Sequence, residues 1–283
     1  MKIAYVVLHY NAYDVTVKCI ESIKRLNANA QIVIVDNNSP NNSGAELERQ
    51  YSQASNIHVL LNKDNVGFAK GNNIGYKYAK FNLDAELIID INNDVTIDQL
   101  DFEDMVEEIV ESDSTIGVIA PKIINRLGKN QNPYRMGPMS NIKRARYVLT
   151  YIAYYIGLKS PLWKSTYKML TRNNNAVTGS YEKKKYDIVP HGACVIFTPS
   201  YVEKSDVAFV PITYFYGEED ILYEYIKRMH LRTIYSPEIR IDHWEKASTS
   251  TVGDDERERV IFQTKNRIRS YFAGLMFAMK IYS

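Results

Sequence analysis

The feature that most constrains the fold is an alternation of apolar runs with helical patterns in the first hundred residues. The run IAYVVLHY is apolar almost throughout, as expected for a strand buried on both faces. After it, Val17, Ile20, Ile23 and Leu26 recur at helical spacing. The runs QIVIVD, IHVLLN and AELIIDINND repeat the strand pattern, and residues 45–52 and the segment DNVGFAKGNNIGYKYAK between them are typical of helices. This order predicts an α/β fold with a mostly parallel, Rossmann-like sheet covered by helices on both faces.

The composition is that of a folded chain. Of the 283 residues, 45% are apolar and 24% are charged, which provides a core and argues against disorder. The net charge of +2 argues against a nucleic-acid-binding protein. Cys19 and Cys194 lie in apolar runs, so we expect two buried thiols rather than a disulfide. The N-terminus lacks a secretory signal pattern and no run approaches the ~20 apolar residues of a spanning helix, so we expect a cytoplasmic protein.

Polar residues gather where the expected strands end. The four places are residues 9–11, 36–39, 62–67 and 92–94. Ligands of open parallel sheets bind at the carboxyl ends of the strands. Asn and Asp are common in turns for local reasons, so one such cluster would be weak evidence. Four of them at one edge of the sheet predict a ligand site there.

The common nucleotide-binding loops are absent from this edge. The first strand is followed by NAYDVT rather than by the G-x-G-x-x-G of a dinucleotide-binding fold, and the chain has no Walker loop. The glycine-rich, arginine-containing loop expected of a sugar nucleotidyltransferase is missing too. A nucleotide would therefore have to bind in another way.

Seven motifs follow one another along the chain. They are VVLHYNAYDVTVKCIESI, VDNNS, NVGFAKGNNIG, INNDV, HGACVIF, YFYGEEDILYEYIKR and SPEIRIDHWEKAST. Each is moderately specific, but the ordered series resembles family 2 glycosyltransferases, especially the rhamnosyltransferase-like bacterial members that build capsule and O-antigen chains. The resemblance covers about residues 2–124 and 186–250. It implies a GT-A-type fold, a nucleotide-diphosphate sugar donor, a divalent metal ion and inversion at the anomeric carbon.

The resemblance assigns the polar strand ends to the donor. Asp36 is expected to accept hydrogen bonds from a uracil or thymine ring or from a ribose, with an Asx-turn as the local alternative. Gly67, Gly71 and Gly75 fall on one helical face, where they permit either close helix packing or, as we favour, approach of the backbone to the ribose and diphosphate. The expected donor-binding residues are His9, Tyr10, Asn11, Asp36, Asn38, Asn65, Gly67, Lys70, Asn72, Asn92, Asn93, His191 and Gly192.

The motif INNDV stands where the family has its D-x-D motif. A Mg²⁺ or Mn²⁺ ion held by one or two carboxylates there would neutralise the leaving diphosphate, and Asp94 is the expected ligand. Asn92 replaces the first carboxylate of the motif, and Asp90 lies two residues earlier on the same strand face. Family members commonly have a histidine at the position of His243, and imidazole suits Mn²⁺. We therefore expect a metal site made by Asp94 and His243.

Three consecutive acids open the helix ILYEYIKR. Acidic residues favour a helix N-terminus on electrostatic grounds alone, which is the local explanation for Glu218, Glu219 and Asp220. The family has Glu-Asp here, and its Asp is the general base that takes the proton of the acceptor hydroxyl. Residue identity favours Asp220 as this base, whereas counting back from Pro237 and His243 without a gap favours Glu219. We prefer Asp220 and keep Glu219 as the alternative.

The middle of the chain is basic and aromatic. Residues 141–185 hold ten Lys or Arg and one acidic residue, Glu182, with interleaved aromatics at Tyr147, Tyr151, Tyr154, Tyr155, Trp163, Tyr167 and Tyr181. We expect a helical face that contacts anionic lipid headgroups or a lipid-diphosphate acceptor, with Lys143, Arg144 and Arg146 as its basic cluster. A solvated surface helix or an oligomer contact is the alternative.

These changes divide the chain into four parts. They are a nucleotide-sugar-binding half (1–124), a basic aromatic helical insertion (125–185), an acceptor and catalytic half (186–250) and a C-terminal helical segment (251–283). The short apolar stretch 271–278 in the last part is expected either to pack or to add to the membrane contact.

The expected function is that of an inverting, metal-dependent glycosyltransferase of cell-surface polysaccharide synthesis. It would move a sugar from dTDP-rhamnose or a UDP-hexose to a hydroxyl of a glycan or lipid-linked acceptor, at the inner face of the cell membrane. A sugar nucleotidyltransferase and a non-catalytic nucleotide- or glycan-binding subunit are the alternatives. The donor sugar, the acceptor, the linkage and the oligomeric state stay open at this point.

Overall fold

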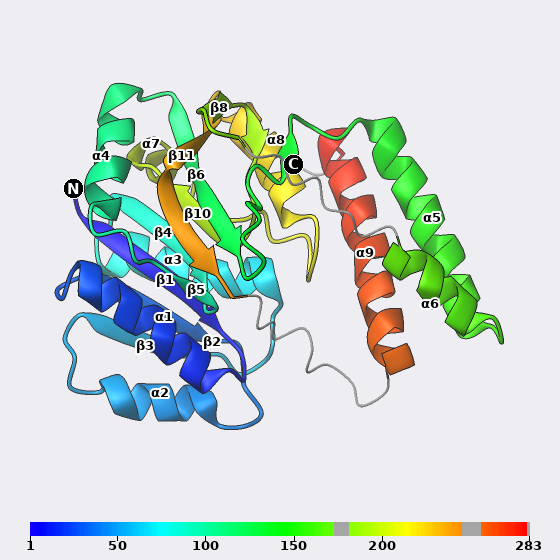
Figure 1. Cartoon of the computed structure of the whole chain (residues 1–283), viewed down its shortest axis with the longest axis horizontal. Helices are drawn as coiled ribbons and strands as arrows, with labels where there is room; N and C mark the ends of the chain where they lie inside the picture. Colours follow the sequence, from blue (N-terminus) through cyan, green and yellow to red (C-terminus); the bar gives the residue numbers. More distant parts are fainter. Residues whose placement is uncertain (173–180, 245–255, 282–283) are drawn as a thin grey trace.

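The computed structural model describes residues 1–172, 181–244 and 256–281, which are coloured in Figure 1. Residues 173–180 of the expected insertion lie outside the described residues, as do 245–255, with the end of the motif SPEIRIDHWEKAST, and 282–283. All statements below concern the described part of the chain.

A nine-stranded sheet forms the centre of the described residues. Its order is β3 (Ile57–Leu61), β2 (Gln31–Asp36), β1 (Ile3–His9), β4 (Leu87–Asn92), β10 (Cys194–Phe197), β6 (Ile116–Asn125), β11 (Arg232–His243) and β5 (Val95–Thr96), with β8 (Lys185–Tyr186) paired to β11. Strands β3, β2, β1, β4, β6 and β11 run in one direction, and β10, β5 and β8 run against them. The mostly parallel sheet predicted from the sequence is confirmed.

Helices cover both faces of this sheet, as predicted (Figure 1). On one face, helices α1 (Tyr13–Leu26), α2 (Ser43–Tyr51) and α4 (Phe102–Ser112) bury apolar side chains against alternate residues of the strands. On the other face, α3 (Phe68–Asn82), α7 (Pro199–Lys204) and α8 (Glu218–Arg228) do the same with the intervening residues. Strand β1 illustrates the cause, because Tyr5 and Val7 enter the first core and Ala4 and Val6 the second. Cys19 and Cys194 are buried free thiols, as expected.

The run DIVPHGACVIFT, which looks like one strand in the sequence, is broken into two. Strand β9 (Ile188–Val189) pairs with β7 (Arg135–Met136) in a separate two-stranded sheet, and β10 joins the central sheet. Pro190 has no N–H to donate to a ladder, and the side chain of Asn132 accepts the N–H of His191 at 2.8 Å. The chain therefore turns at residues 190–193, which places His191 and Gly192 beside the carboxyl end of β4.

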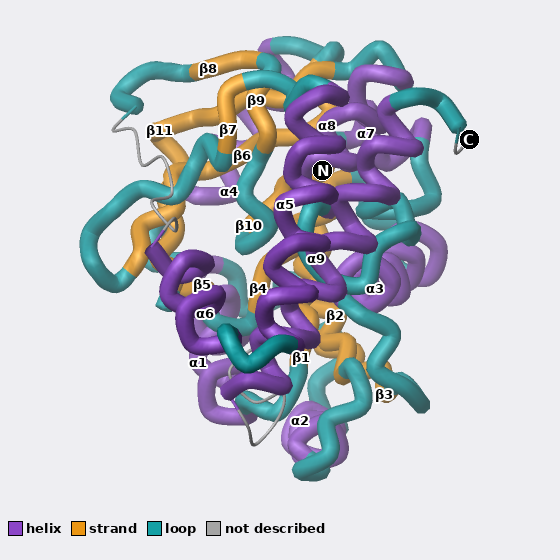
Figure 2. Tube along the Cα trace, turned by 90° about the vertical axis from the view of Figure 1, so that its right-hand side faces the viewer, coloured by secondary structure: helices purple, strands orange, loops and turns teal. Residues whose placement is uncertain are grey.

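The expected insertion and the expected C-terminal segment pack together. Helix α5 (Asn141–Lys159) runs alongside α9 (Glu256–Ala278), and α6 (Trp163–Arg172) lies at the end of α5 (Figures 1 and 2). Helix α9 is fastened to α8, because Arg228 lies over the ring of Phe277 at 3.8 Å and Gly274 approaches Ile221. The pair thus forms a wall beside α8 rather than a separate appendage.

This packing corrects the expected membrane face of the insertion. The rings of Tyr147 and Tyr151 lie 5.1 and 5.5 Å from the ring of Tyr271 in α9, so they pack inside the wall. Arg144 is 3% exposed and forms an ion pair with Glu224 of α8 at 2.8 Å, so it cannot contribute to a basic surface cluster. Arg144 is buried and the two tyrosines are half-buried because two distant helices meet there. Among the described residues, no helix is both long and apolar enough to cross a bilayer.

Candidate active site

The carboxyl ends of four strands bring the predicted site residues to one edge of the sheet. In the register of the parallel strands, His9 of β1 lies beside Asp36 of β2, and Leu8 lies beside Asn92 at the end of β4. The last strand arrives at the same edge, where the N–H of Trp244 donates to the carbonyl of Asp94 at 2.9 Å. The clustering that the sequence predicts is therefore present in the fold.

The two expected metal ligands are in contact with each other. Nε2 of His243 lies 3.2 Å from Oδ1 of Asp94, and both residues are less than a tenth exposed. On the other side of the imidazole, Nδ1 lies 2.7 Å from Oε1 of Gln131. In the tautomer that donates from Nδ1 to this amide oxygen, the lone pair of Nε2 faces the carboxylate. Two acceptors at this separation require a cation or a proton between them.

This arrangement fits a divalent ion that shares its coordination with a substrate. Among the described residues, no three His, Cys, Asp or Glu side chains gather into a metal cage. Mg²⁺ and Mn²⁺ at phosphate-transfer and phosphate-release sites are commonly held by one or two protein ligands together with substrate phosphates. Gln131 would orient His243 in the way that second ligands of metal sites do. It lies in a loop whose sequence carries no recognisable pattern, so the sequence alone did not indicate it.

A buried polar network supports the ends of β1 and β4. His9 is fully buried, and its ring nitrogens lie 2.6 Å from the hydroxyl of Thr16 and 2.8 Å from that of Ser43. Burial lowers the pKa of His9 to about 4 in spite of the nearby Asp36 carboxylate, so the ring is neutral at neutral pH. Asn93 also turns inward, where its amide donates to Thr16 at 2.9 Å. A direct contact of His9 or Asn93 side chains with the donor stays a prediction.

Asp36 forms the local turn that the sequence offered as the alternative to nucleotide binding. Its carboxylate accepts hydrogen bonds from the backbone N–H and the hydroxyl of Ser39. Gly44 is required beside it, because a Cβ there would lie 2.2 Å from Oδ2 of Asp36. Asn11 and Asn38 flank this turn with φ values of 61° and 62°, in the left-handed region that Asn tolerates. The contact of Asp36 with a base or ribose stays a prediction.

Asn37 is a structural centre of the site that the sequence analysis did not single out. Its side-chain oxygen accepts from the amide of Asn62 and from the backbone N–H of Val66. Its amide donates to Asn65 at 3.0 Å and to the carbonyl of Gly67 at 3.2 Å. The residue thus ties the end of β2 to the loop that opens α3. Asn37 is the second polar residue of the motif VDNNS, and its place in this motif was the signal in the sequence.

The glycines of NVGFAKGNNIG serve packing more than nucleotide approach. A Cβ at Gly71 would lie 2.7 Å from a methyl of Leu8, and one at Gly75 would lie 2.4 Å from a methyl of Val6. Both glycines therefore let α3 sit close on β1, which corrects our preference for a backbone approach to the diphosphate at these two positions. Gly67 differs, since it has φ 82° and faces the carbonyl of Tyr214. Lys70 is exposed beside it, and Asn72 is fully buried.

The two candidate bases lie in different surroundings. Both oxygens of Asp220 bind the guanidinium of Arg135, one at 3.1 Å and the other closer. Among the described residues Glu219 forms no ion pair, although the charge of Arg135 also acts on it; its carboxylate accepts the backbone N–H of Gly192 and is partly exposed. Burial, and after it the charge of Asp220, raises the pKa of Glu219 to about 7. A carboxylate with this pKa can take and return a proton at neutral pH, whereas both oxygens of Asp220 are already engaged by a guanidinium.

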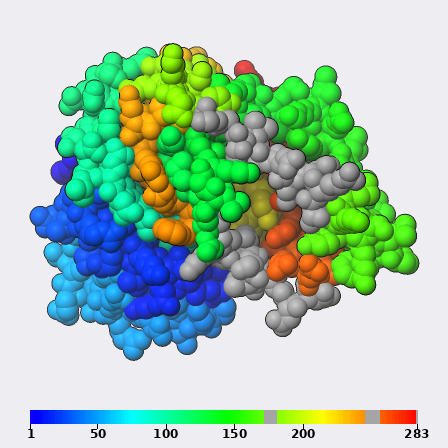
Figure 3. Space-filling view, in the orientation of Figure 1, coloured from blue at the N-terminus to red at the C-terminus, as the bar shows by residue number. Residues whose placement is uncertain are grey.

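The turn at His191 and Gly192 joins the metal pair to the base. The ring of His191 lies 5.8 Å from that of His243 on one side and 6.1 Å from that of Tyr134 on the other. Burial and the neighbouring His243 lower the pKa of His191 to about 3, so this ring is neutral as well. Glu219 reaches the same turn at Gly192. Figure 3 shows the surface hollowed between the side that carries β11 and the orange-red α9.

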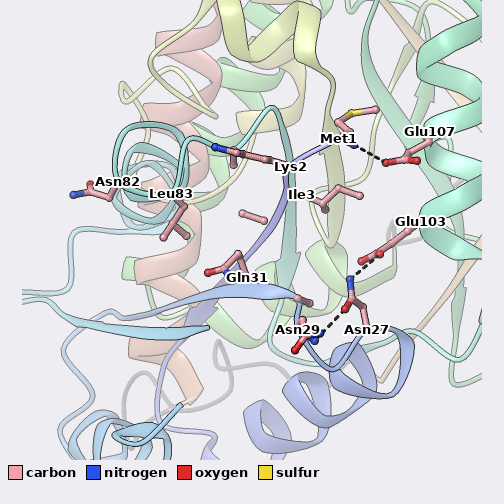
Figure 4. Close-up of a pocket in the computed structure, with 13 residues that line it drawn as sticks. Met1, Lys2, Ile3, Asn27, Asn29, Gln31, Asn82, Leu83, Glu103 and Glu107 are labelled. Carbon is pink, nitrogen blue, oxygen red and sulfur yellow. Dashed lines mark hydrogen bonds and ion pairs between the residues drawn. The ribbon is translucent and has the colours of Figure 1, made fainter. Parts of the chain in front are cut away.

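A second hollow lies away from these residues. It has a volume of about 570 Å³ and is lined by residues such as Met1, Lys2, Asn27 and Glu107 (Figure 4). The terminal amino group of Met1 approaches Glu107 at 3.5 Å in its wall. These residues lie at the amino end of β1, opposite the edge where His9 and Asp36 lie. The second hollow is therefore not the candidate site.

Comparison with known families agrees with this geometry. Residues 5–171, more than half of the chain, match the family described as "Glycosyl transferase family 2". The chain belongs to glycosyl transferase family 2. The resemblance inferred from the ordered motifs is confirmed at the level of the family, whereas the rhamnosyltransferase-like subgroup stays a prediction.

Curated relatives of this family 2 glycosyltransferase match it over part of their length. The low-salt glycan biosynthesis hexosyltransferase Agl10 of Haloferax volcanii is 30% identical over 117 residues, which cover 41% of this chain and 36% of the relative. Glycosyltransferase GlyG of Streptococcus pneumoniae is 29% identical over 115 residues, which cover 40% of this chain and 37% of the relative. The matched part thus spans little more than a third of each relative.

Solved structures of low sequence identity share the fold. The structure of S. aureus TarS in complex with UDP aligns with a TM-score of 0.56 at 12% identity, over 95% of this chain and 64% of that one. GalNAc-T7 with UDP, GalNAc and Mn²⁺ aligns with a TM-score of 0.58 at 14% identity, over 88% of this chain and 44% of that one. The GT-A-type fold expected from the sequence is confirmed.

Proposed function

We propose that this family 2 glycosyltransferase moves a sugar from a nucleotide-diphosphate donor to a hydroxyl of a glycan or lipid-linked acceptor, with inversion at the anomeric carbon. The observation that carries the proposal is the pairing of Asp94 with His243 on one side of the His191–Gly192 turn and the placing of Glu219 on the other. A leaving diphosphate is stabilised by positive charge, whereas an attacking hydroxyl needs a base to take its proton. The His191–Gly192 turn lies between the residues that would provide these two functions.

The metal side fits Mn²⁺ or Mg²⁺. Asp94 and His243 would hold the ion, with Gln131 orienting the imidazole through its 2.7 Å contact. When bound, such an ion supplies positive charge that stabilises the departing diphosphate. Asn92, which replaces the first carboxylate of the family motif, is partly exposed at the end of β4 beside this pair.

Glu219 is the base in this proposal, in place of Asp220. It takes the proton of the acceptor hydroxyl, and the acceptor oxygen forms a bond to the anomeric carbon on the face opposite the diphosphate. The bond between that carbon and the diphosphate oxygen breaks, and the nucleoside diphosphate leaves with the electron pair. Asp220 acts as a positioning residue, because its ion pair with Arg135 fixes the first turn of α8.

The relatives support a hexose donor and a role in glycan assembly. Agl10 is named a hexosyltransferase of glycan biosynthesis, and TarS has been solved with UDP and with UDP-GlcNAc. A UDP-hexose and dTDP-rhamnose are the two donor classes to compare. Synthesis of a cell-surface polysaccharide is the process that we propose for the whole protein.

Contact with the inner face of a membrane is a further part of the proposal. The outward residues of α5 include Ile142, Leu149 and Ile156, which are 83%, 68% and 64% exposed. They recur at spacings of seven, so they share one side of the helix, and exposed basic residues lie among and beyond them. Apolar side chains among basic ones suit the surface of an anionic bilayer.

A transfer assay tests the proposed reaction. The protein is incubated with Mn²⁺ and UDP-glucose, UDP-N-acetylglucosamine or dTDP-rhamnose, and the release of nucleoside diphosphate is measured. We expect release with at least one donor, its loss in excess chelator, and a fall of at least about 100-fold in Asp94→Asn. Asp98→Asn, which changes an exposed carboxylate four residues further on, should retain full activity. Release of pyrophosphate from a nucleoside triphosphate and a sugar phosphate would instead indicate a nucleotidyltransferase.

Nucleotide binding without any release would leave a binding subunit as the better description. Full activity in excess chelator would remove the metal from the mechanism.

A further inference from the structure

Arg267 of α9 is a partly buried cation whose partners in the described residues are tyrosines. One guanidinium nitrogen lies 3.0 Å from the hydroxyl of Tyr151. The guanidinium also lies over the rings of Tyr216 and Tyr151, at 4.8 and 5.6 Å from their centres. Burial raises the pKa of Tyr216, so this ring carries no negative charge at neutral pH. Within the described ranges, no carboxylate forms an ion pair with Arg267.

Two other arginines near this site, one half-buried and one buried, are neutralised. Arg135 binds Asp220, and Arg144 binds Glu224. Removing a guanidinium from water is costly unless a counter-charge replaces the lost hydration. A guanidinium that keeps only rings and a phenol as partners is therefore prepared to accept an anion from outside the chain.

Arg267 lies beside the segment that leads into α8, the helix that carries the candidate base. Tyr216 directly precedes Gly217, the residue before α8, and both have positive φ values of 74° and 79°. For a bulky residue such a backbone is unusual, and here it holds the Tyr216 ring against Arg267. The hydroxyl of Ser270 donates to the carbonyl of Phe215 at 2.7 Å, which fastens α9 to this segment.

The metal pair lies on the opposite side of the base. From Asp94 and His243 the contacts lead through His191 to Tyr134, whose ring is 46% exposed. Burial is the main cause that raises the pKa of Tyr134; the charges of Glu219 and Asp220 add to it, and those of Arg135 and Arg267 oppose it. A donor whose diphosphate lies at Asp94 and His243 therefore leaves Arg267 and the tyrosines to the acceptor. Figure 3 shows the surface hollowed beside the orange-red α9, the helix that carries Arg267.

We infer that Arg267 binds an oxyanion carried by the acceptor, a phosphate or a carboxylate, with the neighbouring tyrosine rings as a platform for its sugar. This subsite rests on the proposed function, because it needs a transferase whose acceptor approaches Glu219 from the side of α9. In this proposal the α5–α9 wall contributes directly to acceptor specificity.

Binding of simple probes tests the subsite apart from catalysis. The protein is saturated with UDP and Mn²⁺ so that the donor side is filled, and the affinities of glucose 1-phosphate, glucuronic acid and methyl glucoside are measured by calorimetry. We expect at least one of the two anionic probes to bind roughly 10-fold or more tightly than the neutral one, as a charge-assisted hydrogen bond provides. The tighter of the two identifies the anion as a phosphate or a carboxylate.

Arg267→Gln should remove this preference and leave the affinity for UDP unchanged. Arg267→Lys should retain part of it, because the charge remains while the planar donor pair is lost. Arg269→Gln is the matched control, since Arg269 is an exposed residue of the same helix. Unchanged UDP affinity also verifies that each variant is folded.

Two results would overturn the inference. One is equal affinity of the unaltered protein for all three probes. The other is a loss of UDP affinity in Arg267→Gln with the preference for the anionic probe intact. Failure of the unaltered protein to bind UDP at all would contradict the proposed function itself, so the two failures are distinguishable.

Discussion

Glu219 and Asp220 are neighbours in the first turn of α8, but different groups contact their carboxylates. Asp220 meets the guanidinium of Arg135, whereas Glu219 meets the backbone of Gly192 and the charge of Asp220. Burial, and after it the charge of Asp220, raises the pKa of Glu219. We therefore propose Glu219 from its surroundings, whereas residue identity favours Asp220 as the base.

Substitution of Glu219 and substitution of Asp220 should have different effects on activity and stability. Glu219→Gln should lower kcat by about 100-fold or more with little change in UDP affinity, because the group acts on the acceptor. Asp220→Asn leaves Arg135 without its counter-charge, so it should lower the melting temperature and retain measurable transfer. Single-turnover rates, UDP binding and thermal unfolding separate these effects. An inactive Asp220→Asn beside an active Glu219→Gln would restore Asp220 as the base.

The pH dependence of kcat/KM should reflect the titration of Glu219. Since its pKa is raised to about 7 and the base must be ionised, kcat/KM should rise with pH through about 7. Burial and the charge of Glu219 raise the pKa of the adjacent Glu218 to about 8, so the rise should level off only above that pH. His9 and His191 have pKa values lowered to about 4 and about 3, so they stay neutral over this range and add no second step. Rates measured from pH 5.5 to 8.5 at saturating Mn²⁺ test this. A profile that falls with pH would exclude a carboxylate base of raised pKa.

At the scale of elements, α5 has two faces with different uses. One face packs tyrosines and Arg144 against α9 and α8, and the other exposes Ile142, Leu149 and Ile156. The inner face holds the wall that carries Arg267, and the outer face is available to a surface. The amino-acid composition of residues 141–185 does not show which residues face inward and which face outward, so it could not distinguish the two faces.

The outer face of α5 should direct binding to anionic vesicles. The double variant Lys143→Gln, Arg146→Gln should weaken partition onto phosphatidylserine-containing vesicles roughly 30-fold at low salt, at about 1 kcal/mol for each charge. Arg144 is left unchanged because its ion pair with Glu224 is internal. Lys77→Gln, at an exposed position of α3, is the control. Sedimentation measures the partition, and equal binding to neutral and anionic vesicles would contradict the membrane face.

At the scale of the whole molecule, the site is assembled from distant parts of the chain. Asp94 follows β4, His243 ends β11, and Glu219 belongs to α8. The sheet joins them, because β11 pairs with β6 and with β5, the short strand that begins directly after Asp94. Donor and metal binding should therefore stabilise the fold as a whole.

UDP and Mn²⁺ together should raise the melting temperature by more than the sum of their separate effects. A ligand present at 100 times its Kd adds about 2.7 kcal/mol to the stability of the folded state. His243→Ala should remove the joint effect and leave the response to UDP alone. His58→Ala, which changes a histidine of the edge strand β3, should retain it. Additive shifts in the unaltered protein would argue against a shared site.

The sequence by itself determined the alternation of strands and helices, the polar strand ends and the order of the motifs. These follow from local periodicity and from the few residue types that turns and ligand sites accept. The tertiary structure decided which side chains are engaged. Arg135 reaches Asp220 across 85 residues and Arg144 reaches Glu224 across 80. Gly71 and Gly75 face Leu8 and Val6 for the same reason. A local pattern encodes the face that a residue occupies, whereas its partner and its pKa depend on elements that only folding brings together.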